Sequence, residues 1–191
     1  MKKIILASAS PRRKQLLEML GLKFTVYPSE IEEHLTASLS PRQQVESLSR
    51  QKATAVAHKF QDSIILAADT MVVLKKELIG KPRDEADARQ MLKRFSGTQH
   101  SVVTGFTLLD TETKRTVTKS TETKIWFRKM TAKEIASFVK KEKPLDKAGA
   151  YAIQELASVF IEKIEGDYMN AIGLSVFLLV KELKQFGIEV L

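Results

Sequence analysis

The stretch LASASPRRKQLLEMLG, residues 6–21, contains a strand end, a tight loop and a helix start. The preceding residues 4–7 are apolar and β-branched, which is typical of a buried strand. Ser10 followed by Pro11 is the signature of a helix N-terminus, because a serine hydroxyl can cap a free N–H and proline has none to lose. We therefore predict a helix that begins at Pro11 and is capped by the Ser10 side chain.

Two arginines stand in the first turn of this predicted helix. Arg13 shares a helical face with Leu16, Leu17 and Leu20, and Arg12 lies beside it. Cations at a helix N-terminus oppose the helix dipole, and a bound anion would reverse that effect. The pattern predicts a cradle for a phosphate chain, and a solvated basic turn is the alternative.

The totals describe an ordinary globular protein. The 191 residues are 43% hydrophobic and 28% charged, which fits a single domain over residues 1–191 with a substantial core. There is no cysteine, so thiolate chemistry is excluded and a reducing compartment is favoured. The apolar run near the N-terminus is too short for a signal peptide, and no run is long enough to span a bilayer. We expect a cytoplasmic protein with no membrane partner.

The formal net charge of +8 indicates attraction to anions. The lysines are spread along the chain, and an aromatic content of 7% provides no ladder for stacking bases. Dedicated nucleic-acid binding is therefore not expected, although a basic regulatory protein that binds nucleic acid or a division partner stays open as an alternative.

Hydrophobic periodicity and capping residues predict the remaining elements. We expect an α/β fold in which helices flank a mixed, twisted sheet. The predicted strands cover residues 22–27, 63–68 with 71–74, 100–110, 113–128 and 159–164, and the predicted helices cover residues 41–60 (capping box at Ser40), 85–95 (Asp84 cap), 132–143 (Thr131 cap) and 174–186.

Two features outside the first helix point to chemistry. Lys52 interrupts an apolar helical stripe, which indicates either a side chain that reaches the helix edge or one that faces an anion. Asp69 ends the apolar run 63–68, at the strand end where α/β proteins place ligand sites. Glu30, Glu32 and Glu33 form an acidic loop that could contact a metal or a water, and solvated charge is the alternative.

Later loops add a lysine and a glutamine. Gly80-Lys81-Pro82 is a rigid loop that presents Lys81, but it lacks the spacing of a P-loop. Small residues at 148–150, where a backbone can approach a ligand, precede Gln154. The Gln154 amide offers a donor and an acceptor together, which suits the edge of uracil or thymine.

The pattern as a whole favours one reaction type. The three histidines have no metal-binding spacing, and no GxSxG elbow is present. Cations beside strand-end carboxylates can neutralise phosphates, hold a divalent metal and take a proton from water. The combination favours hydrolysis of a phosphoanhydride.

Several long motifs also resemble one family at consistent spacing. LASASPRRKQLLEMLG, AADTMVV with the following IGKP, FSGTQHSVVTG and DKAGAYAIQ closely resemble the Maf family of nucleoside triphosphate pyrophosphatases, over nearly the full length. The resemblance implies cleavage between the α and β phosphates with Mg²⁺ or Mn²⁺. It also implies an ITPase-like fold with two lobes around a central nucleotide cleft.

The resemblance carries roles to individual positions. It implies Asp69 as proton acceptor and Glu33 with Asp69 as metal contacts. The implied phosphate-binding residues are Ser8, Arg12, Arg13, Lys52 and Lys81. Arg12, Thr70 and Gln154 look like the specificity set of the branch that acts on dTTP and UTP, and inosine-like purines are the alternative substrates.

The resemblance further implies house-cleaning of non-standard pyrimidine nucleotides and a link to septum formation and the arrest of cell division. It leaves a homodimer open. Two positions depart from the family pattern: Ala152 stands where a glycine is common and could narrow the base pocket, and Ser175 stands where proline is usual. We expect the second departure to alter only the start of the final helix.

Overall fold

The structure is a computed structural model that describes residues 2–191. Its strands are β1 (Lys3–Leu6), β2 (Phe24–Val26), β3 (Ser63–Leu74), β4 (Glu77–Ile79), β5 (Gln99–Asp110), β6 (Thr116–Phe127) and β7 (Ile161–Glu165). Its α-helices are α1 (Pro11–Met19), α2 (Pro41–Ala57), α3 (Glu85–Phe95), α4 (Ala132–Glu142), α5 (Tyr168–Ile172) and α6 (Val176–Leu183). Three short 3₁₀ helices are η1 (Ala148–Ala150), η2 (Leu156–Phe160) and η3 (Lys184–Phe186).

The strands form a seven-stranded sheet in the order β2-β1-β3-β5-β6-β7, with β4 paired to β3. β1 is parallel to both β2 and β3. In contrast, β4 pairs antiparallel with β3, and β7 pairs antiparallel with β6. The sheet is therefore mixed and flanked by helices, which confirms the predicted α/β class.

The chain divides into two compact units. The first contains the chain up to Thr70, then Thr104–Thr121 and Gly173–Leu191, and the second contains Met71–Val103 and Glu122–Ile172. Strands β3, β5 and β6 each contribute residues to both units.

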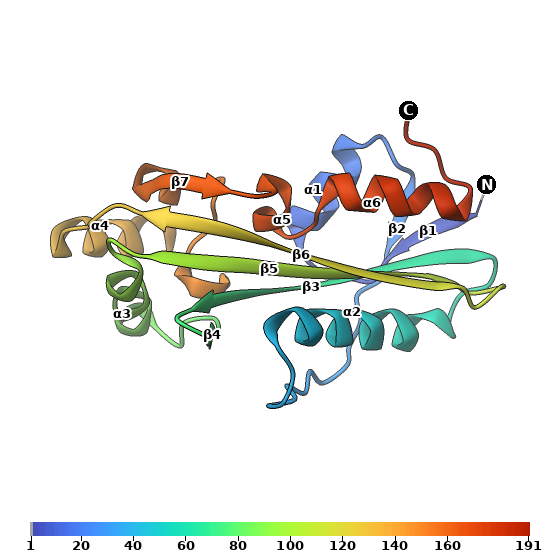
Figure 1. The fold of residues 1–191 in the computed structure, drawn as a ribbon, viewed down its shortest axis with the longest axis horizontal. Helices are drawn as coiled ribbons and strands as arrows, with labels where there is room; N and C mark the ends of the chain where they lie inside the picture. The colour runs from blue at the N-terminus through green and yellow to red at the C-terminus, as the bar shows by residue number, and fades with distance from the viewer. Residues whose placement is uncertain (1) are drawn as a thin grey trace. The chain divides into compact units, whose positions relative to one another are not determined.

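In the first unit, helices cover both faces of the strands. One face packs against α2. Its cluster contains Ala53 and Val56 of α2, Ile65 and Ala67 of β3, Ile5 of β1, and Ala7 of the loop after β1. The strand residues alternate in this way because every second residue of a strand points to the same face. Helices α1 and α6 cover the opposite face (Figure 1). Gly105 of β5 lets α2 approach closely, since a Cβ at this position would lie 2.8 Å from the backbone carbon of Val45.

In the second unit, helices α3 and α4 and the strand ends enclose one core. Leu92 and Phe95 of α3 pack in the same cluster as Phe138 of α4 and Phe127 of β6. Buried His100 lies within this aromatic group, and its Nε2 is 2.5 Å from the hydroxyl of Tyr151.

Most predicted elements are confirmed, with shifts at some ends. The capping boxes at Ser40 and Thr131 and the cap at Asp84 are present. The strand predicted from residue 159 begins at Ile161 instead, because the preceding residues form η2. The last predicted helix is shorter than expected, and Ser175 caps it by accepting the N–H of Leu178. The effect of serine in place of the family's usual proline at this helix start stays a prediction.

Candidate active site

The loop after β1 and the acid of β3 belong to neighbouring parallel strands of the first unit. Leu6 pairs in register with Leu66, and the N–H of Ala7 donates to the carbonyl of Leu66 over 2.7 Å. Ser8 follows one strand by two residues, and Asp69 follows Leu66 by three. The strand end expected at Asp69 is wrong, because β3 continues to Leu74, where Val72–Leu74 pair with β4. Ser8 and Asp69 instead both lie just beyond the end of β1, where β3 extends past it.

The loop closes on itself before helix α1 begins. The hydroxyl of buried Ser8 accepts the N–H of Ser10 at 3.3 Å. The helix begins at Pro11 as predicted, but the expected cap is wrong, because the Ser10 side chain makes no capping hydrogen bond. The serine that organises this turn is Ser8.

Arg13 is a buried side chain that joins three parts of the first unit. Its Nε donates to the carbonyl of Gly173 at 3.0 Å, and its Nη1 donates to the Ser8 hydroxyl at 2.9 Å. Its Nη2 donates to the hydroxyl of Thr70 at 3.0 Å. Burial lowers the pKa of Arg13, Asp69 raises it and Arg12 lowers it further. The guanidinium nevertheless stays charged at neutral pH.

These contacts reveal two residues to which the sequence analysis assigned no role. The hydroxyl of Thr104 in β5 lies 3.0 Å from that of Thr70. Gly173 has a φ of +136°, a conformation that favours glycine, and offers its carbonyl to Arg13. A buried threonine within the apolar run of β5 was the only signal for Thr104, and Gly173 had none.

Lys52 faces anions, which is one of the two alternatives that its place in an apolar stripe leaves open. Its Nζ lies 2.7 Å from Asp69 Oδ1 and 2.7 Å from Glu33 Oε1. The side chains of Lys52 and Asp69 are 12% and 9% exposed, whereas that of Glu33 is 50% exposed. The acidic loop thus brings Glu33 to Asp69, while Glu30 and Glu32 make no contact with this pair in the part of the chain that the structure describes.

Arg12 is the neighbour of Arg13 in the first turn of α1, but it takes no part in the contacts of Ser8, Thr70 or Lys52. Its side chain is half-buried, and no hydrogen bond or ion pair joins it to any of residues 2–191. The Arg12 guanidinium is therefore available to an external anion.

Lys81 and Gln154 belong to the second unit. Both are exposed, and both lie in short loops. The N–H of Gly149 donates to the carbonyl of Gly80 at 2.9 Å, which ties the loop before Lys81 to the small-residue segment. A Cβ at Gly149 would lie 3.2 Å from the Phe95 ring. The close approach that the small residues permit is thus to Phe95 and Gly80, and no ligand is needed to explain it.

The carboxylates of Glu33 and Asp69 fit a divalent metal that takes only two of its ligands from protein side chains. Glu33 and Asp69 both contact one cationic atom, so their oxygens already converge on a single positive charge. Mg²⁺ is commonly held by one or two carboxylates, with the remaining positions filled by water and substrate phosphates. Residues 2–191 contain no cluster of three or more His, Cys, Asp or Glu that could hold a metal without such help.

Arg12 and Arg13 stand in the first turn of α1, directly after the loop that follows β1, an arrangement typical of the class of α/β proteins that bind anionic ligands. The chain belongs to the Maf-like protein family, which it matches over residues 3–186.

The relatives carry a consistent name. The chain is 47% identical over 190 residues to a dTTP/UTP pyrophosphatase of Bacillus cereus strain ATCC 10987 / NRS 248, covering 100% of this chain and 93% of that protein. It is 46% identical over 190 residues to a dTTP/UTP pyrophosphatase of Bacillus anthracis, covering 100% and 98%.

The similarity to solved structures is distant. A Ham1 protein of Staphylococcus aureus matches with a TM-score of 0.44 and 14% identity, over 66% of this chain and 72% of that one. A nucleoside-triphosphatase / dITP/XTP pyrophosphatase of Mycobacterium abscessus matches with a TM-score of 0.41 and 15% identity, over 67% and 75%. Within the described residues, no helix is both long and apolar enough to cross a bilayer.

Proposed function

We propose that this protein is a nucleoside triphosphate pyrophosphatase that hydrolyses dTTP and UTP to the monophosphate and pyrophosphate. The observation that carries the proposal is the buried acid Asp69 of β3, whose carboxylate contacts the ammonium of Lys52 beside the arginines of α1. The name shared by relatives that are 46% and 47% identical over the whole chain supports the substrate assignment.

In the proposed reaction, one water is added across the bond between the α and β phosphates. Asp69 accepts the proton of that water, because its carboxylate is a buried acid of β3 with one oxygen free of hydrogen bonds within residues 2–191. The anhydride bond breaks, pyrophosphate leaves, and the new P–O bond stays with the nucleoside monophosphate. Modified pyrimidine nucleotides are included in the proposed substrate range.

The cations of the chain are proposed to hold the triphosphate. Arg12 has no partner among residues 2–191, and each terminal nitrogen of Arg13 keeps one N–H beyond its hydrogen bond to Ser8 or Thr70. Lys52 and Lys81 add two ammonium groups, and Ser8 adds a hydroxyl. Guanidinium forks suit phosphate oxygens because they donate two hydrogen bonds in one plane.

A divalent metal, Mg²⁺ or Mn²⁺, is proposed to bind at Glu33 and Asp69. When bound there, the ion would neutralise negative charge on the phosphates. The carboxylate oxygens and the substrate itself would supply its ligands.

Base selection is proposed to rest on Gln154, Thr70 and Arg12. The Gln154 amide is exposed and makes no hydrogen bond within the described chain, so its donor and acceptor are free to pair with a pyrimidine edge. The Thr70 hydroxyl is fixed by Arg13 and Thr104.

The remaining proposals concern the cell. We propose that residues 1–191 act as one functional domain in the cytoplasm, because the family match extends through segments of both units and the chain has no cysteine. A role in house-cleaning and in septum formation would follow from the same activity.

The experiment is an assay of pyrophosphate release with Mg²⁺ or Mn²⁺ from dTTP, UTP, CTP, dITP and methylated GTP. Wild type, Asp69→Asn and Asp62→Asn are compared. Asp62 is an exposed acid at a φ of +44°, which asparagine tolerates, so it controls for the loss of one charge.

We expect turnover of dTTP and UTP in the wild type and the control, and loss of most turnover in Asp69→Asn with nucleotide still bound. Normal turnover in Asp69→Asn would remove Asp69 from the mechanism. Preference for dITP would replace the pyrimidine assignment. Salt-dependent DNA binding without pyrophosphate release would favour the regulatory alternative.

A further inference from the structure

Lys52 occupies the position at which the two proposed metal-binding carboxylates converge. Its Nζ lies 2.7 Å from an oxygen of Glu33 and 2.7 Å from an oxygen of Asp69. The ammonium donates a hydrogen bond to Asp69 and forms an ion pair with Glu33. No other side chain of residues 2–191 hydrogen-bonds to or forms an ion pair with this ammonium.

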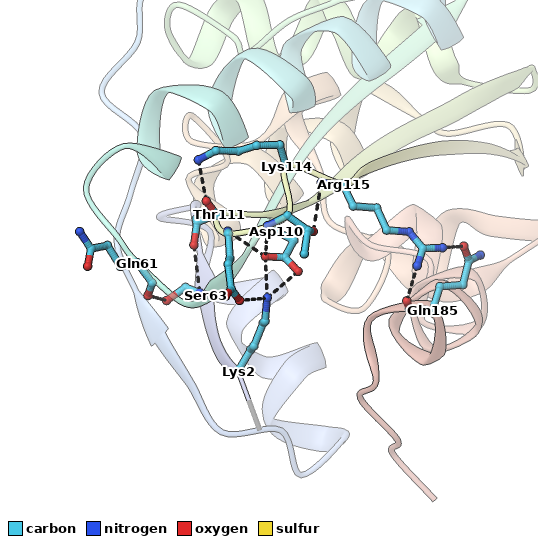
Figure 2. Close-up of polar contacts among 10 residues, drawn as sticks. Lys2, Gln61, Ser63, Asp110, Thr111, Lys114, Arg115 and Gln185 are labelled. Atoms are coloured by element: carbon cyan, nitrogen blue, oxygen red, sulfur yellow. Dashed lines mark hydrogen bonds and ion pairs between the residues drawn. The ribbon is translucent and has the colours of Figure 1, made fainter.

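Lys2 also lies between two carboxylates, and a comparison with it shows what differs at Lys52. Lys2 Nζ lies 2.8 Å from Asp110 and 2.8 Å from Glu112. Figure 2 shows Lys2 against Asp110, the last residue of β5. Oδ1 of Asp110 also accepts the backbone N–H groups of Glu112 and Thr113, so this carboxylate is fixed by the turn as well as by the lysine.

Asp69 has no such backbone support. Among residues 2–191 its carboxylate is held by Lys52 alone, and its second oxygen has no hydrogen-bond partner. Within residues 2–191, the one cation in direct contact with the Asp69 carboxylate is therefore a movable side chain, since Arg13 acts on it only through space. Removal of Lys52 leaves two carboxylates that face each other with no cation between them.

A divalent cation and the Lys52 ammonium compete for the same two oxygens. Two positive charges cannot share that position, because they repel at short range in a partly buried site. A triphosphate offers the ammonium another anion, and the four-carbon stem of lysine allows the movement.

We propose that Lys52 is a resident counter-ion that keeps the carboxylate pair closed to metal until a nucleotide draws the ammonium away. This inference rests on the proposed function, since it takes Glu33 and Asp69 as the metal contacts. Metal and nucleotide then bind with positive coupling, and each raises the affinity for the other by the same factor. Lys52 thereby acts as a gate for the metal as well as a phosphate contact.

The test measures Mn²⁺ binding to nucleotide-free protein, by the loss of the free Mn²⁺ signal in electron paramagnetic resonance. Wild type is compared with Lys52→Met and with Lys14→Met. Lys14 is an exposed lysine of α1 whose only ion pair is to Glu18 at 3.5 Å, so its variant changes the net charge equally.

We expect Lys52→Met to bind Mn²⁺ at least tenfold more tightly than wild type, and Lys14→Met to bind within twofold of wild type. The gain should disappear in the double variant Lys52→Met/Asp69→Asn. Addition of α,β-methylene UTP should increase Mn²⁺ affinity in the wild type by at least tenfold more than in Lys52→Met.

Unchanged Mn²⁺ affinity in Lys52→Met would overturn the gate, and so would a gain that survives in the double variant. Either result leaves the wild-type release of pyrophosphate as a separate measurement, so failure here is distinguishable from failure of the proposed reaction. A folding defect in Lys52→Met is bypassed by a Mg²⁺ titration of wild type with ¹³Cε-labelled lysine, in which the Lys52 signal should shift. A Lys52 signal that does not move with saturating Mg²⁺ would also overturn the proposal.

Discussion

Arg13 donates a 3.0 Å hydrogen bond to the hydroxyl of Thr70, a residue 57 positions later in the chain. The same guanidinium holds Ser8 and the carbonyl of Gly173. One buried cation thus fixes the loop before α1, the residue of β3 next to Asp69, and the segment between α5 and α6.

We predict that Arg13→Lys loses about 2 kcal/mol of folding free energy and at least tenfold in kcat/KM for dTTP. Lysine keeps the charge but cannot direct three hydrogen bonds from one rigid plane. Urea unfolding and steady-state kinetics measure the two effects. Arg12→Lys, which breaks no contact within the described chain, is the control and should keep the wild-type stability. Equal stability of the two variants would show that the Arg13 network does not support the fold.

We predict that Gln154→Ala reduces the preference for dTTP over CTP by about tenfold or more, because a site that hydrogen-bonds its substrate discriminates strongly against analogues. The side chain is exposed, so the stability should not change. Gln51→Ala, at an exposed glutamine of α2, should leave the ranking of substrates intact. An unaltered ranking in Gln154→Ala would assign base choice to other residues.

We predict that Gly105→Ala destabilises the protein by about 1–3 kcal/mol, since overpacking forces backbone shifts. A Cβ at Gly105 would lie 2.8 Å from the backbone of Val45 and 2.9 Å from that of Glu46. Gly80→Ala, where a Cβ would meet nothing within 4 Å, provides the control in the same thermal-unfolding measurement. Equal melting temperatures would mean that α2 can move away from β5 without cost.

We predict a pH-dependent stability that arises from His100. Burial lowers its pKa from 6.5 to about 3, so between these values the unfolded chain binds a proton that the folded chain does not. Stability should fall as the pH decreases from 6.5 toward 3, with a contribution of up to about 1.4 kcal/mol per pH unit from this residue. Urea unfolding between pH 7 and 4 should show a shallower slope in His100→Gln than in wild type. The variant of exposed His58, His58→Gln, should retain the wild-type slope.

We predict a second, more acidic transition at Asp110. Burial alone would raise its pKa, but the hydrogen bonds from Lys2 and from the backbone of Glu112 and Thr113 outweigh burial and lower it to about 2. The carboxylate therefore contributes stability that is complete above about pH 4 and is lost as the pH falls through 2. Asp110→Asn should lose this dependence, whereas Asp62→Asn should keep it. Parallel acid-unfolding curves for wild type and Asp110→Asn would contradict the assignment.

The sequence predicts those features that local chemistry determines. The Ser40 and Thr131 capping boxes each require residues three positions apart, and both are present where predicted. The apolar run at 63–68 forms the start of β3, because a continuous apolar segment of this length suits a strand buried on both faces. The apolar stripe left two alternatives for Lys52, a side chain that reaches the helix edge or one that faces an anion, and the structure shows the second.

The rest depends on contacts that only the folded chain creates. The stripe leaves open that Lys52 faces an anion, but the identity of its partners follows from the fold of the acidic loop. The contact between Arg13 and Gly173 spans 160 positions, and no local pattern encodes it. Ser10 stands at the N-cap position, but its side chain makes no capping hydrogen bond. The side-chain hydrogen bond in this turn is instead the one that the Ser8 hydroxyl accepts from the N–H of Ser10. The roles of Lys81 and Gln154 stay predictions.

The order of segments along the chain has a consequence for biosynthesis. The first compact unit includes Gly173–Leu191, so the buried Arg13 obtains its last partner, the carbonyl of Gly173, only after every residue of the second unit has been translated. The first unit, although it begins earlier in the chain, is therefore the later of the two to be completed during synthesis. Premature termination after Ile172 would thus leave a guanidinium without its main-chain acceptor, and such fragments should be recognised by cellular proteases before they could bind a nucleotide.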